Sequence, residues 1–202
     1  CVLDDAALRH LVAPDDAVVH LAGENRPADG QAFADVNTGL TERVCQGLKA
    51  VGQSIPVLLA SSAQAERDNP YGRSKLAAEQ AVQALAAEHG NPVAIYRLPV
   101  VFGKWCKPHY NSVVATFCHN KAHDLPVQIH DASGRVRLVY VDDVINAMLG
   151  QLASGWTGVV RPVIEPEYSV TLGELSDQID AFKNCRSTLV SSTKSLAVLV
   201  SP

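Results

Sequence analysis

The sequence predicts an α/β fold in which a doubly wound parallel sheet is covered by helices on both faces. Three observations predict it. Short apolar runs of strand length alternate along the chain with longer segments of helical periodicity. These runs are continuous, as is typical of strands that are buried on both faces. Of the 202 residues, 47% are hydrophobic, which is enough for a sizeable core in one domain or most of one.

The expected strands are apolar runs that end at turn residues. The first run ends at Gly23, and the second runs directly into Ser61 and Ser62. The four expected strands cover residues 16–22, 55–60, 93–97 and 136–141.

The expected helices carry regular apolar spacing or clear end signals. The longest is rich in Ala, follows the turn Asn69-Pro70 and stops at Gly90. The last has Thr171 and Glu174 at the spacing of a capping box. The five expected helices cover residues 36–51, 71–89, 111–123, 142–153 and 171–183.

Composition excludes several classes of protein. A net charge of −4 gives no basic surface for nucleic acid or an anionic membrane. No apolar run reaches the roughly 20 residues that span a bilayer, and the start lacks the basic and apolar regions of a signal peptide. The 5 cysteines contain no C-x-x-C pair, so we expect reduced thiols, no metal and a cytoplasmic location.

Tyr71 and Lys75 are the strongest chemical signal. Residues four apart on a helix lie on one face, one turn apart. An ammonium beside a phenol favours the phenolate and lowers the pKa of tyrosine from about 10. We therefore predict that Tyr71 transfers a proton, although a Tyr-x-x-x-Lys spacing alone is common by chance.

The position of Ser62 strengthens this prediction. It ends a buried strand immediately before the Tyr71 helix. Ligands of open parallel sheets bind beyond the carboxyl ends of the strands. We therefore expect a catalytic site made of Ser62, Tyr71 and Lys75, with Ser62 in better register than Ser61.

These motifs resemble the extended short-chain dehydrogenase/reductase family, also called the NAD-dependent epimerase/dehydratase family. The resemblance is carried, in order, by Val18–Gly23, Asn37, Leu58–Ala63, the Tyr71/Lys75 pair, Arg97–Gly103 and Arg137–Asp143. It implies a Rossmann-like sheet with a small substrate-binding C-terminal part. It also implies cofactor contacts at Leu21, Ala22, Gly23, Asn37, Tyr71, Lys75, Pro99, Val101 and Phe102, and substrate contacts at Ser62, Asn111, Ser112 and Arg137.

A closer resemblance is to the reductase domain of the capsular polysaccharide synthesis family of CapF and its O-antigen counterpart WbjC. Three stretches carry it: 62–72, with only nine residues from Ser to Tyr, 102–118, and 170–175. The resemblance implies reduction of a UDP-linked 4-keto-6-deoxy-N-acetylhexosamine with NADPH, on the route to UDP-N-acetyl-L-fucosamine. It also implies a homo-oligomer.

The chain departs from this family at both ends. No glycine-rich turn, which cradles the cofactor pyrophosphate, precedes the first motif, so we expect that the N-terminal strands are missing and cofactor binding is weak. We also expect that these 202 residues do not include the family's C-terminal cupin domain. We expect a partial dinucleotide-binding core at 1–103, a substrate-binding region interleaved with the last core strands at 104–186, and an irregular tail at 187–202.

Other interpretations stay open at this point. A sugar-nucleotide 4-epimerase uses the same Ser, Tyr and Lys and keeps its NAD bound. A 4,6-dehydratase usually has acidic residues after the catalytic Ser or Thr, whereas Ala63 and Gln64 follow here. A non-catalytic relative or inactive fragment is the third option. We interpret His20, His119, His123 and His130 as structural, and Cys106 and His109 as packing or substrate contacts. Lys104 and Lys107 are either charges near a diphosphate or part of a solvated face.

Overall fold

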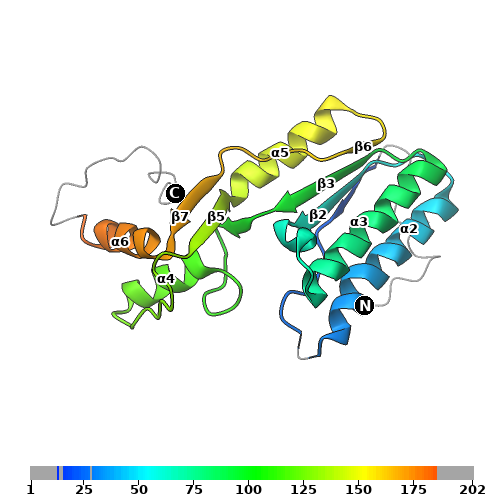
Figure 1. Ribbon diagram of the computed structural model, residues 1–202. Helices are drawn as coiled ribbons and strands as arrows, with labels where there is room; N and C mark the ends of the chain where they lie inside the picture. The colour runs from blue at the N-terminus through cyan, green and yellow to red at the C-terminus, as the bar shows by residue number, and fades with distance from the viewer. Residues whose placement is uncertain (1–12, 14–15, 28, 186–202) are drawn as a thin grey trace. The chain divides into compact units, whose positions relative to one another are not determined.

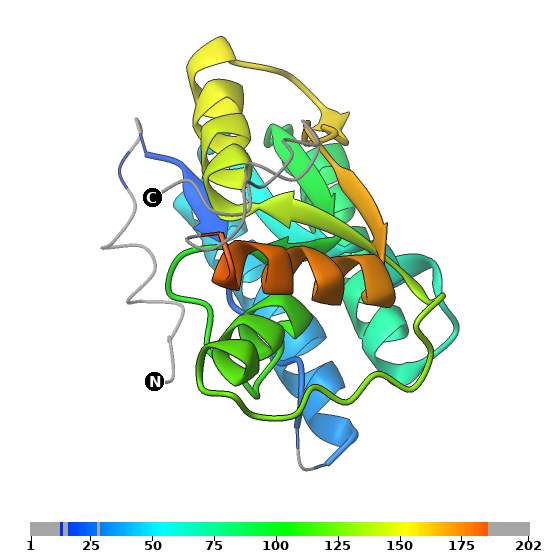
Figure 2. The ribbon, with the colours of Figure 1, turned by 90° about the vertical axis from the view of Figure 1, so that its left-hand side faces the viewer.

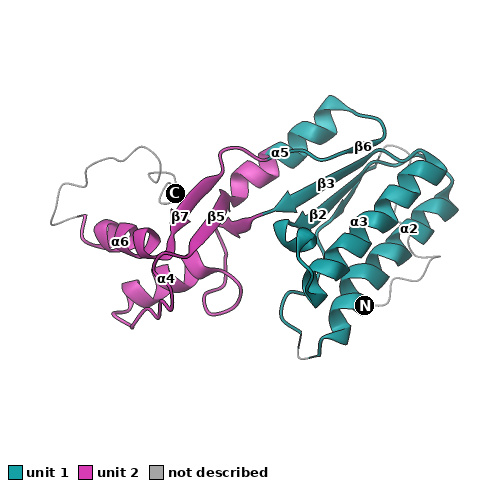
Figure 3. Ribbon diagram, viewed as in Figure 1, with its two compact units in different colours: residues 1–98, 147–163 teal, residues 99–146, 164–202 magenta. Residues whose placement is uncertain are grey.

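The structure is a computed structural model that describes residues 13, 16–27 and 29–185 (Figures 1 and 2). The chain divides into two compact units (Figure 3). Unit 1 consists of Cys1–Leu98 and Ala147–Val163, and unit 2 consists of Pro99–Asn146 and Ile164–Pro202. The tail predicted at 187–202 lies outside the described residues. The functional division predicted at residue 103 stays a prediction.

Unit 1 is built on a four-stranded sheet in which every neighbouring pair is parallel. Its strands are β1 (Val18–His20), β2 (Val57–Ser62), β3 (Val93–Leu98) and β6 (Val159–Val160), in the order β1-β2-β3-β6. The central strands β2 and β3 pair over their full length, from Val57–Val93 to Ser62–Leu98. Their carboxyl ends therefore lie together, at the edge where ligands of such sheets bind.

The helices α2 (Leu40–Val51) and α3 (Pro70–His89) cover one face of this sheet (Figure 1). Their apolar side chains meet those of β2 and β3 in one core, which includes Val44, Leu48, Val82, Leu85, Val57, Leu59, Val93 and Ile95. On α5 (Val141–Ser154), the carbonyl oxygen of Ala147 accepts a 3.2 Å hydrogen bond from the Tyr96 hydroxyl of β3. The predicted arrangement of helices around a parallel sheet is thus confirmed in unit 1.

Local signals explain where α3 begins and ends. The Asn69 side chain accepts a 2.8 Å hydrogen bond from the amide of Gly72, and Pro70 occupies the first turn, where its missing N–H costs nothing. Gly90 ends the helix with a left-handed φ of 73°. The predicted helix and its glycine stop are confirmed.

Unit 2 contains a smaller sheet with the order β4-β5-β7. Here β4 (Val100–Phe102) and β5 (Arg135–Tyr140) are parallel, whereas β7 (Tyr168–Thr171) is antiparallel to β5. The helices α4 (Val113–Ala122) and α6 (Leu172–Lys183) lie beside each other (Figure 2). They enclose a core that includes Phe102, Phe117, Leu138 and Leu175. The capping box predicted for Thr171 and Glu174 is present.

Three strands were not expected from the sequence. They are β4, β6 and β7, which have only 3, 2 and 4 residues, too few for periodicity to mark them. The strand expected at 136–141 forms, but in the second sheet and not in the main one. The predicted parallel sheet is thus the sheet of unit 1, and the smaller sheet of unit 2 is mixed.

Two kinds of feature are absent from the described residues. In that part of the chain, no helix has the length and apolar character needed to cross a membrane. Nor does it hold a group of three or more His, Cys, Asp or Glu residues placed to bind a metal ion. The four described cysteines, Cys45, Cys106, Cys118 and Cys185, are free thiols.

Candidate active site

Ser62 and Tyr71 meet in unit 1, as the sequence predicts. Ser62 is the last residue of β2, and Tyr71 is in the first turn of α3. The Ser62 side chain lies close enough to Tyr71 to lower the pKa of the phenol by hydrogen bonding, and the Ser62 hydroxyl accepts a 3.1 Å bond from the amide of Gln64. The short helix η2 (Ala63–Glu66) connects the two and lets the chain turn within a few residues.

Gly72 permits the close approach of α3 to η2. A Cβ atom at this position would lie 2.3 Å from the carbonyl oxygen of Arg67 and 2.4 Å from that of Gln64. Both distances are far inside van der Waals contact with backbone atoms. Only glycine therefore lets Tyr71 come this near to the end of β2.

Lys75 lies one turn beyond Tyr71 on α3. Lys75 is buried, with 7% of its surface exposed, and its ammonium nitrogen lies 6.0 Å from the centroid of the Tyr71 ring. The ammonium donates a 3.3 Å hydrogen bond to the carbonyl oxygen of Ala60 on β2. A lysine ammonium has three N–H donors, so this bond leaves donors for a bound hydroxyl group.

The turn after β1 lies against Lys75. Leu21, Ala22 and Gly23 are exposed there. A Cβ atom on Gly23 would lie 2.9 Å from both the Lys75 ammonium nitrogen and the Asn37 side-chain oxygen. The bare backbone of Gly23 therefore keeps the approach to Lys75 open.

Asn37 joins this turn to the catalytic helix. It lies in η1 (Phe33–Gly39), a π-helical segment that leads into α2, and is 2% exposed. Its side-chain oxygen accepts a 2.8 Å bond from the Glu24 amide, and its NH₂ group donates to the Glu24 carbonyl at 3.1 Å and to the Ser74 hydroxyl at 3.0 Å. Asn37 thus links the turn after β1 to Ser74, the residue before Lys75 on α3.

His20 is buried behind the site. The Thr41 hydroxyl donates its one proton to the Asn37 carbonyl oxygen at 2.7 Å, so it can only accept from the His20 Nε2 atom, 2.8 Å away. Burial lowers the pKa of His20, and the charge of Lys75 lowers it further. His20 is therefore a neutral ring with its proton on Nε2.

The ionisation of Tyr71 corrects one expectation. Burial raises its pKa, and the hydrogen bond with Ser62 is the interaction that lowers it. Burial also lowers the pKa of Lys75. The expectation that Lys75 lowers the Tyr71 pKa was therefore wrong for this structure: removal from water disfavours the charged form of both groups, and the hydrogen bond, not the ammonium, assists the phenolate.

The remaining predicted site residues belong to unit 2. Phe102 is 2% exposed, and its ring packs on those of Tyr140 and Tyr168, so any cofactor contact would come from its backbone. Pro99 and Val101 are partly buried near it in the sequence. These three residues stay predicted cofactor contacts.

Two of the predicted substrate residues of unit 2, Ser112 and Arg137, already have partners within the chain. Ser112 caps α4 by accepting a 3.2 Å bond from the Ala115 amide, whereas Asn111 beside it is exposed. Arg137 forms a two-pronged ion pair with Glu167, with nitrogen–oxygen distances of 2.5 and 2.6 Å. Lys104 is paired with Asp142 at 2.8 Å. Their roles toward a diphosphate stay predictions.

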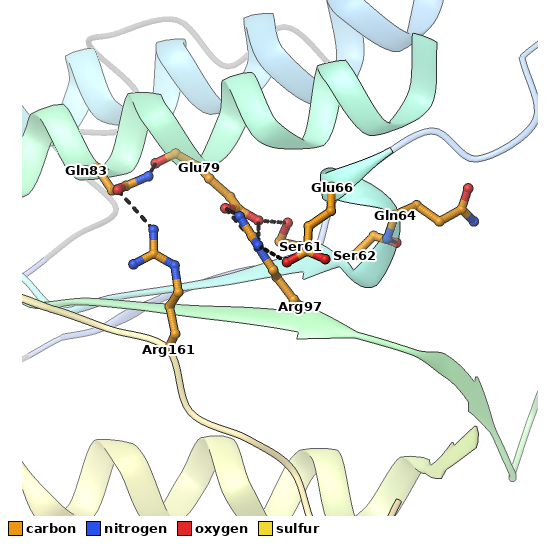
Figure 4. Close-up of polar contacts among 8 residues, drawn as sticks. All are labelled: Ser61, Ser62, Gln64, Glu66, Glu79, Gln83, Arg97 and Arg161. Carbon is orange, nitrogen blue, oxygen red and sulfur yellow. Dashed lines mark hydrogen bonds and ion pairs between the residues drawn. The ribbon is translucent and has the colours of Figure 1, made fainter. Parts of the chain in front are cut away.

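Sequence reasoning missed a polar cluster behind Ser62 that is buried at Ser61 and Glu79 and exposed at Glu66. It consists of Ser61, Glu66, Glu79 and Arg97, all of unit 1 (Figure 4). One signal could have found it: Tyr71, Lys75 and Glu79 are spaced by four and share one helix face. A carboxylate on the buried face of a helix requires a cationic partner.

The residues of unit 1 fit the nicotinamide end of a dinucleotide. The Gly23 turn is exposed and lacks a side chain where a Cβ would fill the space beside Lys75. The Lys75 ammonium and the Tyr71–Ser62 pair supply hydrogen-bonding groups next to that space. A ribose hydroxyl and a flat ring suit such a surface.

Comparison with known proteins decides the family. The model of the NAD dependent epimerase/dehydratase family matches residues 1–160. The chain belongs to the NAD-dependent epimerase/dehydratase family. The resemblance drawn from the sequence motifs is confirmed, and so is the Rossmann-like fold class.

Three relatives illustrate the similarity. The chain is 44% identical over 182 residues to the UDP-2-acetamido-2,6-beta-L-arabino-hexul-4-ose reductase of Pseudomonas aeruginosa, a match that covers 90% of this chain and 49% of that protein. It is 40% identical to the capsular polysaccharide assembling protein CapF from Staphylococcus aureus, with a TM-score of 0.75 over 91% of this chain and 49% of that one. MoeE5 in complex with UDP-glucuronic acid and NAD has a TM-score of 0.75 over 83% of this chain and 62% of that one, and at 22% identity it shows the fold alone.

This chain spans about half the length of the first two relatives.

Proposed function

We propose that the protein reduces the C4 ketone of a UDP-linked 4-keto-6-deoxy-N-acetylhexosamine, with NADPH as the reductant. The observation that carries this proposal is the buried Lys75 ammonium 6.0 Å from the centroid of the Tyr71 ring, with Ser62 at the end of β2 beside Tyr71. Such an arrangement suits the delivery of one proton to a carbonyl oxygen. The 44% identity to a reductase that acts on a UDP-linked hexulose supports this choice of substrate.

Tyr71 acts as the proton donor in the proposed reaction. Its raised pKa keeps the phenol protonated at neutral pH, as a donor must be. When bound, NADPH supplies a hydride to the carbonyl carbon. The phenol gives its proton to the oxygen that gains charge, while the Ser62 hydroxyl donates a hydrogen bond to the same oxygen.

The same side chains would hold the cofactor. Lys75 has N–H donors for the ribose hydroxyls, and the bare backbone at Gly23 gives room beside it. Asn37 keeps the turn in place. In unit 2, we propose that Arg137, Asn111 and Ser112 contact the UDP diphosphate, and that Arg137 exchanges Glu167 for a phosphate, since its planar fork suits both anions.

An assay of the complete gene product that contains these 202 residues tests the proposal. With the 4-keto sugar nucleotide and NADPH, absorbance at 340 nm should fall in proportion to product. Tyr71→Phe should slow this reaction about 10²- to 10⁴-fold while NADPH binding is unchanged, because only the proton donor is removed. Near-normal turnover by that variant would overturn the assignment of Tyr71.

The same experiment separates the alternatives. Tightly bound NAD with no net consumption of NADPH would indicate a sugar-nucleotide 4-epimerase. Failure of the complete product to bind any dinucleotide would favour a non-catalytic relative. A cytoplasmic location and a homo-oligomer remain predictions that fractionation and light scattering would check.

A further inference from the structure

Glu79 is a fully buried carboxylate that the proposed reaction does not use. Its residue is 0% exposed. It lies one turn beyond Lys75 and two turns beyond Tyr71 on α3, so all three residues share the face of the helix turned toward the sheet. A buried carboxylate is costly unless it is paired, and therefore the arrangement of its partners is informative.

Glu79 binds two side chains from the ends of neighbouring strands. The Ser61 hydroxyl of β2 donates to one carboxylate oxygen at 2.5 Å. The Arg97 guanidinium of β3 donates to both carboxylate oxygens, through Nε at 2.9 Å and through Nη2 at 2.7 Å. Figure 4 shows Glu79 and Arg97 pointing toward each other with Ser61 beside them.

Arg97 extends the cluster to the loop between the catalytic residues. Its other terminal nitrogen donates to the Glu66 carboxylate of η2 at 2.7 Å. The carboxylates raise the pKa of Arg97, so it remains a cation. One guanidinium thus joins β3, α3 and η2, and Glu79 adds β2 through Ser61.

The four elements joined by the cluster include β2 and α3, which carry all three predicted catalytic residues. Ser62 follows Ser61 on β2, and its hydroxyl is also held by the amide of Gln64 in η2. Tyr71 and Lys75 are on the same rigid helix as Glu79. Fixing Ser61 and η2 against Glu79 therefore fixes the Ser62 hydroxyl against the Tyr71 phenol.

Stability alone does not explain the cluster. Apolar side chains of similar volume often stabilise a protein as well as a buried ion pair does. What a two-pronged ion pair adds is a defined direction and distance, because the planar guanidinium meets the carboxylate in one plane. Geometry of this kind matters where reacting groups must be placed to within a fraction of an ångström.

We propose that Glu79 and Arg97 are positioning residues that set the separation of the Ser62 hydroxyl and the Tyr71 phenol. This inference goes beyond the proposed ketone reduction but is built on it. The cluster could act on catalysis through its charges or through the geometry that it imposes, and charge-conserving variants separate these two roles. If the cluster acts through charge, variants that keep the charges should behave as the wild type. If it acts through geometry, Glu79→Asp and Arg97→Lys should be impaired, since the first shortens the reach and the second loses the planar fork.

The chain supplies a matched control at Gln83. This residue is the next one on the same helix face, and its side chain accepts a 3.0 Å bond from Arg161 and donates one of 2.9 Å to the Glu79 carbonyl oxygen (Figure 4). It makes polar contacts like those of Glu79 but none with Ser61, η2 or β3 among the described residues. Gln83→Ala should therefore leave catalysis unchanged.

The experiment compares these variants in the complete gene product. We expect kcat to fall about 10- to 100-fold in Glu79→Asp and Arg97→Lys, with KM for NADPH changed less than about twofold. Gln83→Ala should stay within about twofold of the wild type in both constants. Ser61→Ala removes only the hydrogen bond to Glu79, so this variant should fold. We expect it to lower kcat as well. It therefore carries the test if the other variants do not fold.

A second readout does not depend on the reaction. With ¹³C-labelled tyrosine, NMR can follow the titration of the Tyr71 phenol, assigned with Tyr71→Phe. The titration in Glu79→Asp and Ser61→Ala should move toward that of Ser62→Ala, in which the hydrogen bond is absent. Wild-type kcat and wild-type titration in these variants would overturn the inference. If the wild type consumes no NADPH yet the titrations move, the proposed function fails while the positioning role stands.

Discussion

The NH₂ group of Asn37 donates a hydrogen bond to the hydroxyl of Ser74, 3.0 Å away, immediately before Lys75 on the catalytic helix. The Ser74 hydroxyl in turn donates to the carbonyl oxygen of Tyr71 at 2.8 Å. Through the other atoms of its amide, Asn37 holds Glu24 in the turn after β1. One buried amide therefore couples the predicted cofactor turn to the helix that carries Tyr71 and Lys75.

Asn37→Ala should lower both stability and cofactor affinity. It leaves the Glu24 amide and carbonyl and the Ser74 hydroxyl without this partner, and we expect the free energy of unfolding to fall by about 2–3 kcal/mol. NADPH affinity of the complete gene product should fall as well, because the turn at Gly23 loses its support. Urea unfolding and fluorescence titration with NADPH measure the two effects.

Asn91→Ala is the matched control for that substitution. Asn91 is 1% exposed, and its amide donates to the carbonyl oxygen of Ile55 at 2.9 Å, at the opposite end of β2 from Ser62. It should lose similar stability without any change in NADPH affinity. Equal loss of affinity in both variants would mean that Asn37 acts only on stability.

The main sheet and its helices could be predicted because their signals are local and repeated. Continuous apolar runs mark β2 and β3, and α3 carries a cap, a proline and a stop glycine at its two ends. Ser62 could be placed because it directly follows a buried run. These features depend on neighbours in the sequence.

The remaining features arise from contacts between distant residues. Glu79 and Arg97 are 18 positions apart and meet because α3 packs against β3. The ionisation of Tyr71 depends on burial, which spacing on a helix does not reveal. For the same reason the sequence did not indicate the ion pair of Arg137 with Glu167, which are 30 positions apart.

Lys75→Met should make the protein more stable while it abolishes activity. Lys75 is 7% exposed and forms no ion pair within the described part of the chain, so its charge opposes folding. We expect the free energy of unfolding at pH 7 to rise by about 1–3 kcal/mol. Urea unfolding measures it.

The pH dependence of this effect has a defined sign. Burial lowers the pKa of folded Lys75 below 10.5, so the unfolded state binds the proton more tightly. The destabilisation by the buried Lys75 charge is therefore complete below the lowered pKa, and it disappears as the pH rises toward 10.5. The stability difference between Lys75→Met and wild type should therefore shrink at alkaline pH. As a control, Lys121→Met should destabilise, because Lys121 is paired with Asp180.

Ser62→Ala should raise the pKa of Tyr71 further. The bond with Ser62 is the interaction that lowers it against the effect of burial. Since ketone reduction needs the protonated phenol, the decline of kcat/KM at alkaline pH should move to higher pH, while kcat falls about 10²-fold. A pH–rate profile tests both statements. Ser54→Ala, which loses only an exposed bond to the Gly90 carbonyl, should change neither.

Gly72→Ala should separate the two catalytic side chains. A Cβ atom there would lie 2.3 and 2.4 Å from the carbonyl oxygens of Arg67 and Gln64, so the first turn of α3 must move away from η2. We expect a loss of stability of about 2–4 kcal/mol and a fall in kcat of about 10²-fold, in spite of the higher helix propensity of Ala.

Gly150→Ala in α5 provides the contrast. A Cβ atom at Gly150 has no neighbour within 4 Å in the described structure, so the same substitution should stabilise the protein by about 0.5–1 kcal/mol. Thermal unfolding of the two variants should shift in opposite directions. A stabilised Gly72→Ala variant with wild-type turnover would show that α3 and η2 need no close approach, and the contact between Ser62 and Tyr71 would then have another origin.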